Sequence, residues 1–539
     1  MRWLGEALRQ ADRASTAAET RRAPLVVFLV AVGVWWLQAI VLPLAGGRDF
    51  GTYLGAYVEL FQSDPIDLGY VLGRTPVAPL VVGGLISPLG GALAEPGMSI
   101  LYAASITAWF LVARSFGGRA ALLVTIVLLL YPSYGILFHE IASDSIFAVA
   151  FALWSLLVVR VVLAPTVTGF ALVGAGVALL VLVRPGNQAL LVLGLIPLVL
   201  GLRWRARVAS VVVCLAAATC LLGLWTVHNG VRFGDYTVAR GGNSRLPFER
   251  AFLFDRIVRP ENGPSSRRLA EAVDSVLLPE EPYRSYGVGL DDLFSNPSPR
   301  MKDDLGALAN QLDGWKSDER LLREVGIEAV RAHPGTYARG VSTTIYRLLR
   351  WPILRPQQSD GSGSTEGTSG AADTIVVDGR RLPRPSEGER IPSPHFAGPT
   401  SPDGSIYAVW TSPSEHHLVF AHPGDKERYA ALHRRIAELM GNLPDRVGRP
   451  SAERYLNLAS RGFPPAILFL VLGVLGLVLR RPANALALST PAVAGFIVVV
   501  LSALAITAIP YYSVPVAPAF LLLAAGSLLA SRRSDTTAS

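Results

Sequence analysis

Runs of roughly twenty apolar residues alternate with short polar segments along most of this chain. A helix of that length crosses a hydrocarbon core about 30 Å thick, so each run is a candidate membrane span. The pattern therefore predicts an all-α polytopic membrane protein. The runs fall at 24–44, 76–93, 97–113, 120–138, 145–163, 167–183, 188–202, 207–226, 463–479, 484–508 and 512–531.

Composition agrees with this class. Of the 539 residues, 51% are hydrophobic, and the mean hydropathy of +0.40 is too high for a soluble protein of this size. The formal net charge of +8 does not indicate a nucleic-acid partner, because the arginines gather at the ends of the apolar runs, where they orient a membrane protein. The two cysteines, Cys214 and Cys220, lie within one run on different helical faces, so we expect two small apolar residues and no disulfide.

The placement of arginine predicts the topology. The basic N-terminus precedes an apolar run longer than a signal-peptide core, which favours an uncleaved first span. The arginine-rich loops share one side only if segment 76–93 does not cross, and Pro76, Pro79 and Pro88 suit a broken piece lying at the surface. We therefore expect about ten transmembrane helices in a plasma membrane, with both termini cytoplasmic.

This topology divides the chain into five parts. They are a cytoplasmic N-terminus (1–23), spans one to seven (24–226, with a first external loop at 45–96), an extracytoplasmic insert (227–462), spans eight to ten (463–531) and a cytoplasmic tail (532–539).

The insert has a mixed α/β pattern. Helical spacing is best in 318–350, a strand is expected at 374–378, and a helix at 424–441. The low-complexity stretch 356–374 favours disorder. The helical pattern around 327–351 has two interpretations: an ordinary packed helix, or a helix on the membrane surface with Arg347 and Arg350 near the headgroups.

One acidic residue stands at the mouth of the first span. Asp49 follows the first apolar run, and Tyr53 and Tyr57 recur after it at helical spacing. A carboxylate at the lipid–water boundary can act as a general base toward a hydroxyl. The alternatives are that Asp49 caps a short helix at 50–61, since Asp is a good N-cap, or is simply a solvated charge, and these roles do not exclude that of a base.

A second acidic pair precedes the span at 145–163. Glu140 and Asp144 are four residues apart, and we expect them to share one helical face at the start of that span. Acidic residues at a helix N-terminus are stabilised by its dipole, so capping explains them as well as function does.

Four cationic or imidazole side chains are expected on the same external side, close to membrane level. They are Arg74, His139, Arg184 and His228. Arginine binds phosphate through two parallel hydrogen bonds, and Arg184 stands at a helix mouth on the side where arginine is otherwise scarce. The alternative for Arg184 is an ordinary loop or snorkelling arginine. Asp49, His139, Glu140 and Asp144 have the donor types of a metal site, but their spacing matches no metal motif. No cofactor is predicted, although a divalent cation remains compatible.

Several short segments resemble one family. They are Arg48-Asp49-Phe50, Arg114 to Ala120, Glu140 to Phe147, Arg184-Pro185, Trp225 to Gly234, Ala332 to Tyr337 and Tyr512 to Pro518. In their order and topological placement the chain resembles the C-type glycosyltransferases (GT-C), in the bacterial branch related to protein O-mannosyltransferases and lipid A aminoarabinose transferases. The resemblance covers roughly 24–235 and 463–531, and covers the insert poorly.

The resemblance implies a polyprenyl-phosphate sugar donor, a cell-envelope acceptor and one inverting displacement at the external face. It makes Asp49 the catalytic base and aligns Ser143-Asp144 with the acidic position of the second loop. We expect Asp144 and Glu140 to orient the acceptor or a cation. Arg184, then Arg74 and His139, would meet the departing phosphate, with Tyr53, His228 and Tyr512 also lining the substrate site. The resemblance also implies an arginine in the last turn, where this chain has Tyr511 and Tyr512, so a donor-phosphate contact is either missing or supplied by Arg184 or Arg74.

Two other classes remain open. A transporter would show ionisable residues at mid-membrane and a two-fold repeat, and neither pattern is present. A non-catalytic scaffold would use the insert to bind a cell-envelope polymer.

Overall fold

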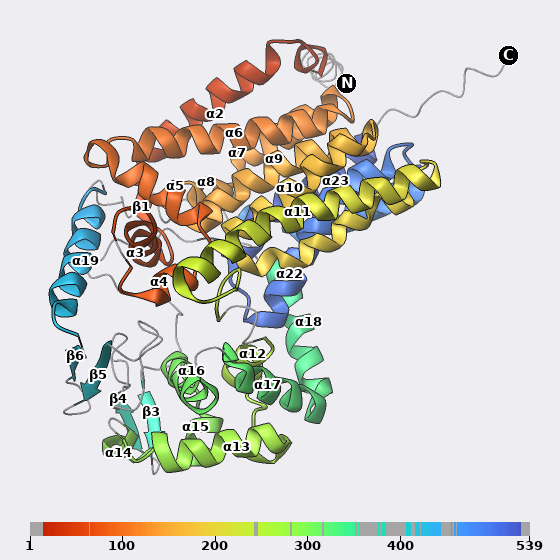
Figure 1. The fold of residues 1–539 in the computed structure, drawn as a ribbon. Coiled ribbons are helices and arrows are strands. Elements are labelled where there is room, and N and C mark those ends of the chain that lie inside the picture. Colours follow the sequence, from red (N-terminus) through yellow and green to blue (C-terminus); the bar gives the residue numbers. More distant parts are fainter. Residues whose placement is uncertain are drawn as a thin grey trace.

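The computed structural model describes residues 15–529 apart from gaps at 64, 242–245, 281–282, 315–316, 351–353, 355–373, 378–379, 384–405, 411–415, 421, 444–453, 455–457 and 460. Helices dominate these residues, and the strands form three separate two-stranded pairs. A bundle of apolar helices occupies one part of the molecule, and a smaller domain hangs from one end of it (Figure 1).

Each of the predicted apolar runs carries a helix. The bundle contains α2 (Ala23–Ala39), α5 (Val77–Ile86), α6 (Ala94–Arg114), α7 (Gly118–Leu130), α9 (Ser143–Leu163), α10 (Val167–Val183), a 3-10 helix (Pro185–Val199), α11 (Trp204–Phe233), α21 (Ala466–Arg480), α22 (Ala485–Ala505) and α23 (Ala517–Leu529). Within the described part of the chain, five helices are long and apolar enough to cross a membrane: Ala94–Arg114, Ser143–Leu163, Trp204–Phe233, Ala485–Ala505 and Pro510–Leu529. The helical, polytopic class is therefore confirmed, whereas the number of crossings stays a prediction.

The outer helices expose apolar side chains. On α2, Leu25, Leu29 and Leu37 are about two-thirds exposed while Trp35 is fully buried, the distribution expected of a helix with one face on lipid and one on protein. By contrast, α23 is buried among its neighbours α21 and α22. The 3-10 helix has 15 residues, and its rise of about 2.0 Å per residue gives it about 30 Å, the thickness of a hydrocarbon core.

Segment 76–93 is broken, as predicted. Its helix α5 has ten residues, about 15 Å, and it ends at a kink where Leu89 and Gly90 adopt left-handed backbone angles. Helix α6 follows this segment, and Arg114 at its C-terminal end donates a hydrogen bond to the carbonyl of Thr20, which precedes α2, at 3.3 Å. The basic residues before α2 and after α6 therefore share one end of the bundle, as they must if 76–93 turns back.

The opposite end carries short elements that shape a loop cluster. They are β1 (Ala45–Gly46), α3 (Phe50–Phe61), α4 (Leu68–Leu72), α8 (Pro132–Leu137), β2 (Glu140–Ile141) and the 3-10 turns Pro510–Tyr512 and Val514–Val516. Within α3 the carboxylate of Glu59 is buried and accepts hydrogen bonds from the backbone N–H groups of Ile66 and Asp67. Burial raises the pKa of Glu59 to about 7. This contact fixes the loop that leads from α3 to Arg74.

The insert forms a domain with its own core. Its helices are α12 (Phe248–Leu253), α13 (Pro264–Ala272), a π-helical turn (Val273–Leu277), α14 (Tyr283–Tyr286), α15 (Leu290–Ser295), α16 (Pro299–Asp313), α17 (Arg320–Ala332), α18 (Pro334–Arg350) and α19 (Asp425–Met440). Its antiparallel strand pairs are β3 (Thr374–Val377) with β4 (Arg380–Pro383), and β5 (Ile406–Trp410) with β6 (His416–Phe420). Leu305, Leu322 and Val325 are fully buried in its core.

Most elements expected in the insert are present. The strand at 374 and the helices in 318–350 and 424–441 are confirmed, and the mixed α/β character holds. The low-complexity stretch 356–373 lies outside the described residues. Helix α11 continues to Phe233, past the expected end of its run at 226, so the polypeptide leaves the bundle later than predicted.

A buried arginine joins the insert to the bundle. Arg250 of α12 is 2% exposed, and its Nη1 donates to the carbonyls of Ala503 (2.6 Å) and Ile506 (2.8 Å) at the end of α22. The last carbonyls of a helix have no partner within the helix, so Arg250 satisfies groups that α22 leaves open. Asp255 pairs with the same guanidinium at 2.9 Å.

Glu328 of α17 provides a test of the insert. Its carboxylate accepts hydrogen bonds from the backbone N–H groups of Ser265 (2.9 Å) and Ser266 (2.8 Å) in the first turn of α13. Burial acts to raise the pKa of Glu328, but hydrogen bonds from Ser266 and Ser265 outweigh it, and the pKa is lowered. We expect Glu328→Gln to destabilise α13 by about 1 kcal/mol at pH 7, measured by amide hydrogen exchange in its first turn.

The pKa of Glu328 is lower in the folded protein than in the unfolded chain. The stabilisation that its carboxylate gives to α13 is therefore fully present above the ordinary glutamate pKa, and it is lost as the pH falls through the pKa of the folded protein. The difference between wild type and Glu328→Gln should therefore shrink below about pH 4. Glu271→Gln, at an exposed carboxylate in the last turn of α13, is the control and should change the stability by about 0.5 kcal/mol or less. Equal protection of α13 in both variants at pH 7 would contradict this account.

Candidate functional site

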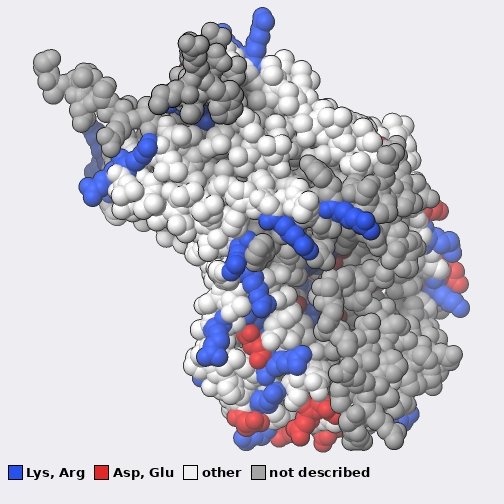
Figure 2. All heavy atoms as spheres, turned by 180° about the vertical axis from the view of Figure 1, so that it is seen from behind, with Lys and Arg blue, Asp and Glu red and all other residues white. Residues whose placement is uncertain are grey.

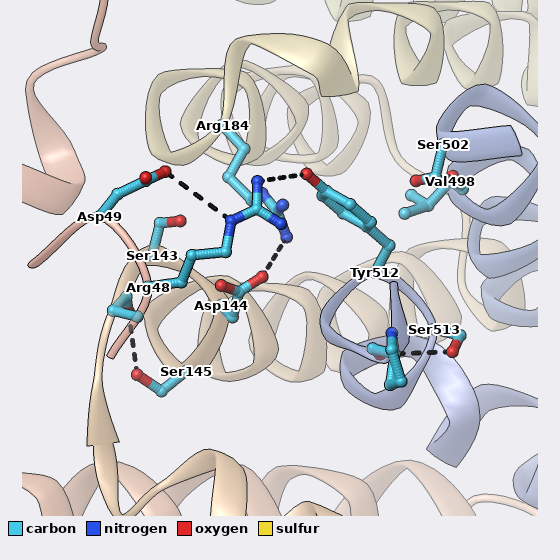
Figure 3. Close-up of polar contacts among 12 residues, drawn as sticks. Arg48, Asp49, Ser143, Asp144, Ser145, Arg184, Val498, Ser502, Tyr512 and Ser513 are labelled. Carbon is cyan, nitrogen blue, oxygen red and sulfur yellow. Dashed lines mark hydrogen bonds and ion pairs between the residues drawn. The ribbon is translucent and has the colours of Figure 1, made fainter. Parts of the chain in front are cut away.

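Three arginines and two carboxylates meet at the loop end of the bundle. Arg48 and Asp49 lie between β1 and α3, and Asp144 lies in the first turn of α9. Arg184 stands between α10 and the following 3-10 helix, and Arg74 follows α4. Figure 3 shows Arg48, Asp49, Asp144 and Arg184 pointing toward one another, with the ring of Tyr512 closing one side. Segments far apart in the sequence thus build one charged cluster.

A short parallel strand pair positions Asp49. Ala45 pairs with Glu140 and Gly46 with Ile141, and the N–H of Gly47 donates to the carbonyl of Ile141 at 3.2 Å. A Cβ at Gly47 would stand 2.8 Å from that of Ala142, so the two loops approach as closely as only glycine allows. The first external loop is therefore held against the second.

The structure shows how the side chain of Asp49 is placed, while its role as a base stays a prediction. The residue occupies the N-cap position of α3, yet its side chain makes no capping hydrogen bond. Its backbone is left-handed (φ 59°), which is uncommon for a residue with a Cβ. The carboxylate instead faces Arg74 at 3.2 Å and Arg48 at 4.0 Å and is 29% exposed. The side chain of Asp49 is therefore a partly exposed partner of two arginines and makes no cap hydrogen bond.

Asp144 and Arg184 form a buried ion pair. Arg184 Nη1 lies 2.6 Å from Asp144 Oδ1, with side-chain exposures of 16% and 5%. A carboxylate taken out of water at such a site needs an opposite charge, so the pair fixes both side chains. Asp144 thus holds the guanidinium of Arg184 in place and is itself closed to solvent, unlike Asp49.

Tyr512 connects two of the arginines. Its hydroxyl accepts a hydrogen bond from Arg48 Nη2 at 2.9 Å, and its ring lies under the guanidinium of Arg184, 4.5 Å from ring centroid to Cζ. A guanidinium over an aromatic face is attracted to the ring's negative quadrupole. Tyr512 therefore orients arginines that other loops supply.

Tyr53 ties the first helix of the loop cluster to α9. Its hydroxyl donates to Ser143 Oγ at 2.7 Å, and Arg74 lies over its ring at 5.5 Å. Burial raises the pKa of Tyr53, so the phenol stays neutral and acts as a fixed support.

Three predicted site residues lie elsewhere. Glu140 belongs to β2 and lies outside α9, so the expectation that it shares a helical face with Asp144 is wrong; it lies beside Tyr511 instead. His139 is 3% exposed and stacks on Trp35 with centroids 4.6 Å apart; burial lowers its pKa to about 3, so it is neutral and does not serve as the expected cation. His228 is exposed on α11 and stacks on Trp225, at 5.0 Å.

Arg48 was missed as a site residue by sequence reasoning. Arg48 immediately precedes Asp49 in one of the segments that carry the family resemblance. That position was the one feature of the sequence that could have indicated a role in the site. Adjacent side chains usually diverge, and the left-handed turn at Asp49 brings both toward the cluster.

The cluster is suited to binding an anion. Arg48 and Arg74 are 22% and 32% exposed, and Arg184, although paired with Asp144, keeps 16% of its side chain exposed. Partly exposed guanidinium groups beside an accessible carboxylate suit a phosphorylated substrate that also gives up a proton. Across the described residues, no group of three or more His, Cys, Asp or Glu side chains comes together in a way that could hold a metal ion.

No protein-family model and no curated protein matches the chain. Among solved structures, the chain is similar to the crystal structure of ArnT from Cupriavidus metallidurans bound to undecaprenyl phosphate. The sequence identity is 14% and the TM-score 0.34, and the likeness covers 95% of this chain and 78% of that one. At so low a TM-score, this likeness assigns neither a fold nor an activity to the chain.

The ion pair predicts a large stability effect. Asp144→Asn removes one charge and leaves the buried guanidinium of Arg184 without its opposite charge, which should destabilise the protein by about 3 kcal/mol in chemical unfolding of the detergent-solubilised chain. The control is Asp303→Asn, at a carboxylate 53% exposed on α16, with an expected change within about 0.5 kcal/mol. If Asp144→Asn and Asp303→Asn have the same free energy of unfolding, the ion pair of Asp144 and Arg184 does not stabilise the fold.

Proposed function

We propose that this chain is a membrane glycosyltransferase that moves a sugar from a polyprenyl-phosphate donor to an acceptor of the cell envelope, at the extracytoplasmic face and with inversion. The observation that carries the proposal is Asp49: an accessible carboxylate, held beside arginines by a strained turn and not used as a cap. The sugar and the acceptor, whether glycan, lipid or protein, are not assigned.

Arg48 and Arg184 are the proposed phosphate ligands. Tyr512 contacts both guanidinium groups, and Asp144 fixes that of Arg184 through their ion pair. Guanidinium groups bind phosphate oxygens through paired hydrogen bonds, and they stabilise the negative charge that grows on a departing phosphate. The loop end of an apolar bundle is also where a lipid-linked phosphate would lie, with its chain in the bilayer.

The proposed step is a single displacement. Asp49 takes the proton of an acceptor hydroxyl while that oxygen attacks the anomeric carbon of the donor. The bond between that carbon and the phosphate oxygen breaks, and its electron pair leaves with the lipid phosphate, which Arg48 and Arg184 hold. One carbon–oxygen bond forms and one breaks, so the anomeric configuration inverts.

The distribution of charge disfavours the transporter alternative. A transporter of this size would be expected to place ionisable groups near mid-membrane. Here the paired charges gather in loops at one end of the bundle, at Asp49, Arg74 and Arg184. A scaffold gives no reason for a strained Asp49 beside arginines.

Asp49→Asn tests the base directly. Asparagine tolerates left-handed backbone angles, so the fold should survive, while transfer should fall about 100-fold or more. The assay uses the purified full chain with membrane extract and a panel of radiolabelled polyprenyl-phosphate sugars, and Asp303→Asn is the control. Transfer by Asp49→Asn at the wild-type rate excludes Asp49 as the base, and no turnover with any donor from folded wild type rejects the transferase.

Arg48→Gln tests the phosphate contact separately from the proton transfer. Losing a charged hydrogen bond to the donor should raise the KM for the lipid-phosphate sugar about tenfold or more. Arg267→Gln, on the exposed face of α13, removes the same charge away from the cluster and should leave the KM unchanged. An unchanged KM in Arg48→Gln would place the donor phosphate elsewhere.

A further inference from the structure

Helix α18 of the insert has two unlike faces. Thr344 and Leu348 are buried, and Ile345 packs beside them against the apolar core of the bundle. The opposite side exposes Arg339, Ser342, Thr343, Tyr346, Arg347 and Arg350, which recur every three or four residues along one stripe. One face of α18 therefore belongs to the bundle and the other is open.

Contacts place α18 at the edge of the bundle. The hydroxyl of Tyr337 donates to the carbonyl of Leu504 at 2.9 Å, and Thr344 accepts from Arg250, whose Nη1 also binds the carbonyl of Ala503. These carbonyls lie in the last turn of α22, which is long enough to span the membrane. In Figure 1, α18 runs crosswise to α11 and lies beside the end of α22. If α22 spans the membrane, a helix at its end and crosswise to the bundle would lie at the level of the lipid headgroups.

The charge of α18 has one sign. Its 17 residues contain three arginines and no Asp or Glu. Arg350 lies over the ring of Tyr346, with Cζ 5.3 Å from the centroid. Tyrosine with arginine is the composition found where a helix rests at a membrane–water interface. Figure 2 shows Lys and Arg side chains in a row where the white upper part of the molecule meets its charged lower part.

We propose that the exposed stripe of α18, formed by Arg339, Thr343, Tyr346, Arg347 and Arg350, binds the headgroups of anionic phospholipids of the surrounding bilayer. The buried face is already fixed on α21 and α22, so the stripe is presented beside the bundle at headgroup level. Each arginine near an anionic surface is attracted to it, and the guanidinium fork fits a phosphodiester better than an ammonium does.

The two sequence interpretations of the region do not exclude one another. The helix is packed through Thr344 and Leu348, and the proposal places its exposed stripe on the membrane. The lipid phosphates proposed here are separate from the donor phosphate, because α18 contributes none of Arg48, Arg74 or Arg184. The proposal therefore stands whether or not the chain is a glycosyltransferase.

The test compares lipid preference in nanodiscs. The full chain is reconstituted in phosphatidylcholine with a minor fraction of phosphatidylglycerol, and the lipids retained on release are counted by native mass spectrometry. We expect wild type to enrich phosphatidylglycerol and the variant R339Q/R347Q/R350Q to lose that enrichment roughly tenfold. The control R267Q/R320Q/R323Q removes the same charge from α13 and α17 and should retain wild-type enrichment.

A second measurement locates the stripe. A spin label at Thr343→Cys, with Cys214 and Cys220 replaced by alanine, should be reached by lipid-borne oxygen more readily than by an aqueous nickel chelate. Equal phosphatidylglycerol enrichment in wild type and R339Q/R347Q/R350Q would overturn the proposal. So would a label reached only from water, which would instead favour a soluble partner or a second copy of the chain.

Discussion

The buried pair of Asp144 and Arg184 is the interaction on which the loop cluster depends. A charge removed from water is tolerated only beside an opposite charge, and here the two partners come from loops 40 residues apart. The contact fixes the joint between α10 and the next helix against the start of α9. Because Arg184 cannot move, the ring of Tyr512 has a defined place to pack, and the last loop of the chain is held in turn.

The remaining geometry follows from that support. Tyr512 orients Arg48, and the hydroxyl of Tyr53 reaches Ser143 beside the ion pair. The parallel pair of β1 and β2 then brings the Asp49 turn to the same place. Strain at Asp49 is tolerated because neighbours on several sides fix it, as is common where backbone conformation serves chemistry. Buried charge thus supports the cluster, and the exposed carboxylate is left available.

The sequence predicted the parts of this structure that depend on local patterns. Apolar runs gave the helices, and the prolines of 76–93 gave the broken segment at α5. Asp49, Arg184 and Tyr512 were all expected near the site, and they meet there. The prediction that Glu140 and Asp144 share one helical face was wrong, because the backbone is not helical between them: Glu140 lies in strand β2 and Asp144 in helix α9. Burial of His139 against Trp35 depends on tertiary packing that no local pattern reveals.

The most direct measurement of the central claim is a structure of the full chain in lipid nanodiscs with a polyprenyl phosphate bound. The account predicts phosphate oxygens about 3 Å from the guanidinium groups of Arg48 and Arg184, with the carboxylate of Asp49 facing the space where a sugar would extend. A phosphate bound at the opposite end of the bundle, or one that contacts neither arginine, would contradict it.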